Sequence, residues 1–170
     1  MAAVFDFSAP VSVQADANIY GICESIKASY LIEGELRNTL QHTYRRAPVQ
    51  DVLGDFFRSA GYEWRFEGHV LHAYPRGTRI GLLDTKLDSV ALKDINAYAA
   101  ISTLLQQAKI RGADARSLFL TQDFRPVNLR ATNISVKEAI RRILETDPSI
   151  FVGLTQRKSV IDHEVLLWKR

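Results

Sequence analysis

The sequence has little of what most catalytic, metal-binding or membrane-spanning chains need. Its 170 residues include a single cysteine, Cys23, which excludes an intrachain disulfide and a cysteine metal cluster. No apolar run approaches the roughly 18–20 residues of a membrane helix, and the first ten residues lack the basic start and apolar core of a signal peptide. Motifs of nucleotide-binding loops, zinc proteases and serine hydrolases are also missing. We therefore expect no catalytic residue, metal or cofactor, and we infer that the chain is not an enzyme.

Histidines and charges add no catalytic signal. The four histidines are interpreted as solvent-facing or hairpin residues, since His69 and His72 fall on opposite faces of a predicted strand. The net charge is +3, and the basic residues are scattered among acidic ones, which is typical of a mixed solvated surface.

Two arginine pairs, Arg45-Arg46 and Arg141-Arg142, form a candidate basic surface. A KH-type RNA-binding domain would need a GxxG loop between helices, and the sequence has none. Arg141 and Arg142 are expected to face solvent, with Glu138 placed for an i, i+4 pair with Arg142. Nucleic-acid binding is therefore kept only as an alternative.

Hydrophobic periodicity predicts an α+β fold of two small domains. Apolar residues at helical spacing predict four helices: one starting at Asp16 or Asn18, one between Pro48 and Gly61, one starting at Asp94 or Asn96, and one between Asn133 or Ser135 and Pro148. Alternating stretches between them, including one strand within residues 31–44, predict strands. Each half then has the order strand, helix, strand, helix, strand, strand, with two helices packed on a short mixed sheet.

The two halves also share a short motif. Residues 16–20, DANIY, and residues 94–98, DINAY, have the form Asp-x-Asn-x-Tyr and lie 78 residues apart, whereas the second helical stripes lie 87 residues apart. The difference predicts a loop insertion near residues 109–118, where extra length costs little. We interpret the chain as an internal duplication, with domains at 1–78 and 79–170.

The first half carries a pattern that resembles a known family. An extended strand at residues 40–44 precedes Ala47-Pro48 at a helix start, an apolar stripe from Val49 to Leu53, a stop at Gly61, an aromatic strand at 62–66 and a hairpin at Gly68-His69-Val70. This order is similar to the N-terminal periplasmic domains of secretins and to the signalling domain of TonB-dependent transducers. Residues 126–147 of the second half have the same form; Pro148, the longer loop at 156–162 and the insertion depart from it.

The resemblance implies a non-enzymatic role and a place in the cell. It implies a periplasmic assembly or docking module of a secretion or pilus channel, which forms rings or binds inner-membrane partners. Its partners would be channel subunits or an inner-membrane platform component, and the chain would be a homo-oligomer. The expected location is the periplasm or the outer membrane, with the chain as a mature domain. Alternatives are a signalling domain of a TonB-dependent transducer and a KH-like nucleic-acid-binding protein.

Each half is expected to offer an edge strand that pairs with another chain. The candidate strands are residues 69–74 and 163–170, and both end in aromatic residues. The candidate interaction residues are His69, Leu71, Tyr74, Val165, Leu167 and Trp168.

Overall fold

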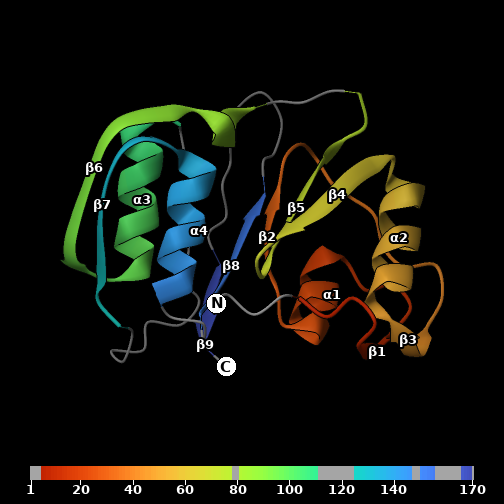
Figure 1. Ribbon diagram of the computed structural model, residues 1–170. Coiled ribbons are helices and arrows are strands. Elements are labelled where there is room, and N and C mark those ends of the chain that lie inside the picture. The colour runs from red at the N-terminus through yellow and green to blue at the C-terminus, as the bar shows by residue number, and fades with distance from the viewer. Residues whose placement is uncertain (1–4, 78–80, 111–124, 147–149, 156–165, 170) are drawn as a thin grey trace. The chain divides into compact units, whose positions relative to one another are not determined.

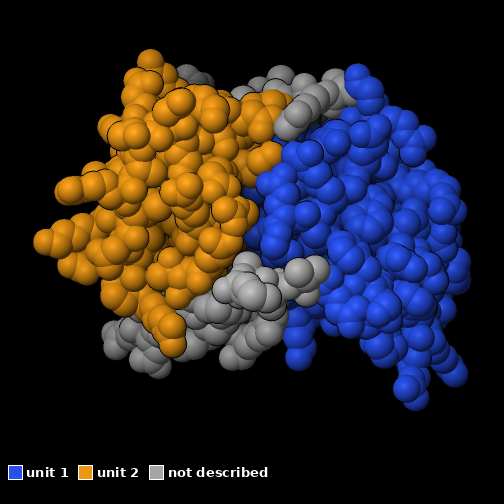
Figure 2. All heavy atoms as spheres, viewed as in Figure 1, with its two compact units in different colours: residues 1–79 blue, residues 80–170 orange. Residues whose placement is uncertain are grey.

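The computed structural model describes residues 5–77, 81–110, 125–146, 150–155 and 166–169. The chain forms two compact units, residues 1–79 and residues 80–170 (Figure 2). Each unit combines two α-helices with short β-strands in its described residues (Figure 1). The expected α+β fold class is therefore confirmed, and the division falls one residue from the expected position.

Unit 1 places one strand at the centre of a small mixed sheet. Its elements are β1 (Pro10–Val13), α1 (Ile19–Ile26), β2 (Ser29–Ile32), β3 (Tyr44–Pro48), α2 (Val49–Ala60), β4 (Tyr62–Glu67) and β5 (Val70–Pro75). Strand β5 pairs antiparallel with β4 and parallel with β2, whereas β1 and β3 form a separate antiparallel pair.

In unit 1, α1 has a side-chain cap at its start and α2 is followed by a glycine. The Asn18 side chain caps α1 by accepting a hydrogen bond from the Gly21 amide at 3.1 Å. Helix α2 buries its whole apolar stripe and ends at Gly61, whose φ of 71° suits a residue without Cβ. Cys23 on α1 is fully buried, and burial raises the pKa of its thiol.

The single strand expected within residues 31–44 is wrong, because two strands only reach the two ends of this range. Strand β2 ends at Ile32, β3 begins at Tyr44, and the residues between form no strand. Gly34 has a φ of 88°, and a Cβ at this position would lie 2.8 Å from the Tyr62 hydroxyl. Backbone hydrogen bonds hold Leu40 against Asp16 and Ala17, just ahead of α1, and its side chain is buried. Leu40 is therefore apolar because an irregular segment packs there, not because it lies on a strand.

Unit 2 follows the expected element order. It contains a 3₁₀ turn η1 (Leu82–Asp84), β6 (Lys86–Ile95), α3 (Ala97–Gln107), β7 (Val127–Ser135), α4 (Val136–Thr146), β8 (Ile150–Thr155) and β9 (Leu166–Lys169). Strands β6 and β7 pair antiparallel, as do β8 and β9. Helices α3 and α4 contact each other and the β6–β7 pair (Figure 1). Most of the predicted insertion near 109–118 lies outside the described residues.

The backbone repeats its unusual conformations at matching places in the two units. Six described residues other than glycine have positive φ, a conformation that costs energy for most side chains. They form three pairs: one two residues before each capping asparagine, one just after each first helix, and one three residues before each second helix. The pairs are Asp16 and Asp94, Lys27 and Lys109, and Arg46 and Asn133.

Hydrogen bonds at the helix starts repeat as well. Asn96 caps α3 as Asn18 caps α1, with its side chain 2.8 Å from the Ala99 amide. The first amide of α2, at Val49, donates to the Ala9 carbonyl, and that of α4, at Val136, donates to the Thr85 carbonyl. The same local geometry in both units supports the interpretation of two copies of one unit.

The matching caps predict matching losses of stability. Replacing Asn18 or Asn96 with alanine removes the acceptor for a helix amide, so each variant is expected to lower the free energy of unfolding by about 1 kcal/mol. Urea denaturation followed by circular dichroism measures both values. Gln107→Ala, at an exposed position of α3, is the control and should stay within about 0.5 kcal/mol of the parent. Loss at only one asparagine would contradict equivalent roles.

Candidate interaction surface

The edge strand of unit 1 is β4, and the expectation that residues 69–74 form it is wrong. Strand β5 is paired on both sides, so Leu71 is fully buried and Tyr74 half-buried. His69 is exposed because it lies in the turn between β4 and β5. A continuous buried run, rather than an alternating one, is typical of a central strand.

In unit 2, two of the three candidate residues lie on the last strand. Val165 is outside the described residues. Leu167 and Trp168 belong to β9, where they stand opposite Val152 and Phe151 of β8.

The outer edge of β4 carries free backbone groups. Strands β4 and β5 are joined by the two-residue turn Gly68-His69, and residues that flank such a turn form a hydrogen-bonded pair. At the other end, the Arg76 amide donates to the Gly61 carbonyl at 3.0 Å, which fixes the alternation. Odd-numbered residues of β4 therefore bond to β5, and the amides and carbonyls of Tyr62, Trp64 and Phe66 point outward.

Those outward groups have no backbone partner among the described residues. No hydrogen bond from another described segment reaches the backbone of Tyr62, Trp64 or Phe66, and β4 ends the strand order of its sheet. An unpaired strand edge accepts another strand by main-chain hydrogen bonding. This edge is therefore the candidate interaction surface of unit 1.

The two faces of β4 differ in chemistry. On the side of α2, Trp64 stacks on Phe57 with ring centroids 6.1 Å apart, and Phe66 stacks on Phe5 at 4.1 Å. On the opposite face, Glu63 and Arg65 are exposed, and Arg65 contacts Glu67 at 2.9 Å. A strand added to β4 would meet aromatic rings on one face and alternating charges on the other.

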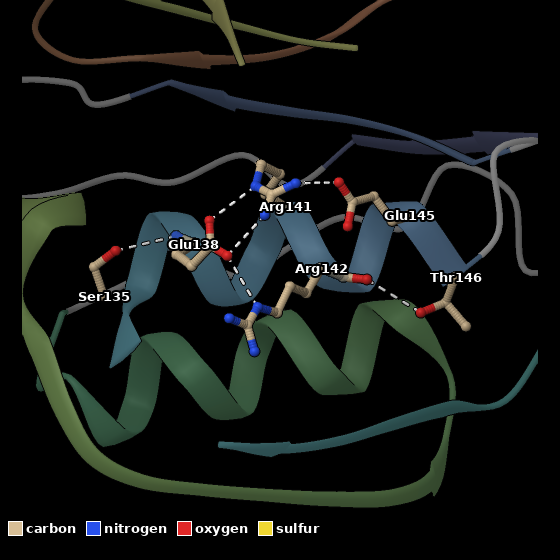
Figure 3. A network of polar contacts seen from close by, with 6 residues as sticks. All are labelled: Ser135, Glu138, Arg141, Arg142, Glu145 and Thr146. Carbon is tan, nitrogen blue, oxygen red and sulfur yellow. Dashed lines mark hydrogen bonds and ion pairs between the residues drawn. The ribbon is translucent and has the colours of Figure 1, made fainter. Parts of the chain in front are cut away.

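Arginines of α4 are held by acidic neighbours rather than offered as a basic surface (Figure 3). Arg141 contacts both Glu138, at 2.7 Å, and Glu145. Arg142 contacts Glu138 at 2.9 Å, which confirms the expected i, i+4 pair. Because two carboxylates offset two guanidinium groups, this face of α4 carries no excess positive charge.

Glu138 is the most strongly perturbed acid of this network. Hydrogen bonds from Arg141 and Arg142 outweigh partial burial and lower the pKa of its carboxyl to about 2. Its amide also bonds to the Ser135 hydroxyl at 3.2 Å, so the residue anchors the first turn of α4.

Arg45 and Arg46 differ from the α4 pair, because both are exposed and form no ion pair with a described residue. They lie on β3, whereas Arg141 and Arg142 lie on the helix of the other unit. The four arginines thus do not share one element or one environment.

One hollow among the described residues has a volume of about 250 Å³ and is lined in part by Lys86, Asn133 and Arg142. This volume is small for a cofactor site.

A buried hydrogen-bonded pair joins β5 to the residue just after β2. His72 Nε2 is 2.8 Å from Glu33 Oε1, and both side chains are 1% exposed. The other ring nitrogen, Nδ1, has no hydrogen-bond partner among the described residues. His72 is a residue of the β4–β5 hairpin, as one of the two interpretations had it, but the solvent-facing interpretation is wrong because its side chain is buried. Its partner lies 39 residues away, so only tertiary structure brings the two together.

The described part of the chain offers no metal site and no membrane helix. No three histidine, cysteine, aspartate or glutamate side chains converge there, and none of its helices has the length and apolarity to cross a membrane.

No family model, no curated protein and no solved structure matches the chain.

The depressed pKa of Glu138 predicts acid sensitivity. A carboxyl whose pKa is lowered on folding stabilises the protein above its unfolded pKa, near 4.5, and loses that contribution as the pH falls toward about 2. Glu138→Gln should therefore be less stable than the parent at pH 6, and the difference should shrink steadily below pH 4.5. Urea unfolding across this range measures it. Asp88→Asn, which removes an exposed carboxylate that pairs with no cation of the described residues, controls for net charge. A constant difference for Glu138→Gln would refute the assignment.

The effect of replacing His72 is expected to depend on whether Glu33 is present. His72→Leu removes the imidazole that contacts the buried Glu33 carboxyl, and loss of a buried polar partner typically costs about 1–3 kcal/mol. In the double variant Glu33→Met with His72→Leu, most of this cost should be absent, because the carboxyl that lost its partner is also gone. Thermal and urea unfolding compare the variants, with His69→Leu as an exposed control. A double variant as unstable as His72→Leu would show that packing, not the polar contact, dominates.

Proposed function

We propose that this chain is a non-enzymatic assembly and docking module of the bacterial cell envelope, acting in a secretion or pilus channel. The observation that carries the proposal is a repeated unit whose first copy combines the secretin-like sequence pattern with an open strand edge. In this proposal the partners are channel subunits or an inner-membrane platform component, and the site of action is the periplasm or the outer membrane.

Several features of the unit favour docking over catalysis. Two polar clusters are structural: Glu138 anchors a helix turn, and His72 with Glu33 is closed off from solvent. Exposed charged side chains lie on one face of β4 and buried or half-buried aromatic side chains on the other, and backbone groups point outward along its edge. Main-chain pairing at such an edge provides affinity, and alternate side chains provide specificity.

The charge arrangement argues against the nucleic-acid alternative. Phosphate binding requires uncompensated basic groups on one face, yet Arg141 and Arg142 are offset by Glu138 and Glu145. Filter binding to RNA at about 50 mM salt tests this point, and tight binding with a steep salt dependence would overturn it. No observation on the chain favours the TonB-type signalling role over the channel role.

Docking is tested by association measurements on the purified chain. Size-exclusion chromatography with light scattering is run between about 10 μM and 1 mM, a range that covers weak interfaces. It is repeated with the periplasmic part of an inner-membrane protein encoded beside this chain. We expect a concentration-dependent oligomer, a complex with the partner, or both. A chain that stays monomeric and binds no envelope protein would refute the proposed function.

A further inference from the structure

We propose that β4 pairs antiparallel with β4 of a second copy of this chain, about a twofold axis at Trp64. This inference rests on the proposed function and names one of its partners. It starts from the outward-pointing backbone groups of Tyr62, Trp64 and Phe66, which no described residue satisfies.

Backbone alternation limits how two copies can pair. In an antiparallel pair, the outward-pointing residues of one copy must face outward-pointing residues of the other, so the axis passes through a residue of β4 and not between two residues. Centring on Trp64 uses the whole strand, Tyr62–Glu67, except its last residue. Centring on Phe66 or Tyr62 would pair only a few residues at one end and leave the rest of the edge open.

The side chains fit the Trp64-centred register on both faces. On the aromatic face, Trp64 meets its own copy and Tyr62 meets Phe66 of the second copy; aromatic cross-strand pairs are stabilising. On the charged face, Glu63 of each copy stands opposite Arg65 of the other. A twofold axis makes this match occur twice, as expected of an isologous contact.

Other arrangements of the same strand place like charges together. A parallel, in-register pair would set Glu63 beside Glu63 and Arg65 beside Arg65. An antiparallel pair centred on Arg65 would oppose the two arginines and set Glu63 of each copy against Glu67 of the other. One centred on Glu63 would oppose the two Glu63 side chains. Directly opposed like charges destabilise strand pairs, so the strand's own sequence selects one register.

Exposure of the charged residues makes this pairing accessible. Glu63 is exposed, and the Arg65 side chain is 45% exposed despite its contact with Glu67. The strand spans about 20 Å at its usual rise per residue, which is short for a permanent interface. We therefore expect a weak dimer that forms at high local concentration, such as that inside a larger assembly.

Charge exchange between Glu63 and Arg65 tests the register. Glu63→Arg creates arginine–arginine pairs in the dimer, and Arg65→Glu creates glutamate–glutamate pairs. Each variant alone should dimerise about tenfold more weakly than the parent, because two attractive cross-strand pairs become repulsive. An equimolar mixture of the two variants restores both attractive pairs, so heterodimers should form with an affinity within about threefold of the parent.

Sedimentation velocity between about 10 μM and 1 mM measures these affinities, and unfolding midpoints check that each variant is folded. Glu24→Arg makes the same charge change at an exposed position of α1 and should leave dimerisation unchanged. A monomeric parent, or a mixture that is no stronger than either variant, would overturn the β4 pairing. If the parent oligomerises or binds an envelope partner in spite of that, the proposed function survives through another surface; if it does neither, both fall.

Discussion

The hydrogen bonds along both sides of β5 constrain the rest of unit 1. Because β2 runs parallel to β5, the chain must cross over between them, and β3, α2 and β4 make that connection. Because β4 takes the other side of β5, it becomes the strand with an open edge. The same central position buries His72 and brings it to Glu33. The candidate surface and the buried pair are thus two results of one pairing.

The positive φ angles that recur at matching places in the two units support the interpretation of a duplication. Asp16 and Asp94 lie outside the core stripes, yet each has a positive φ two residues before a capping asparagine. Unfavourable conformations persist where surrounding hydrogen bonds over-determine them. Here those bonds are the helix caps and the contacts of Val49 and Val136 with the preceding segment. The two units therefore share the constraints that set helix direction.

Sequence reasoning succeeded where the determinants are local. Helical stripes, asparagine caps and the Glu138–Arg142 spacing depend on neighbours within a few residues, and each appears as expected. Strand position does not: whether β5 is central or at an edge depends on β2, about 40 residues earlier, although the unbroken run Val70-Leu71-His72-Ala73 was an available signal. The Glu33–His72 contact left no local pattern, and the irregular segment after Gly34 imitates a strand because Leu36 and Leu40 alternate with polar residues.

The hidden thiol of Cys23 has a practical consequence. It is the only cysteine of the chain, it has no exposed surface, and its raised pKa keeps it in the unreactive thiol form at neutral pH. Any cysteine introduced on the surface would therefore be the single group to react with a maleimide dye or spin label. Surface cysteines for distance measurements can thus be introduced without first replacing Cys23.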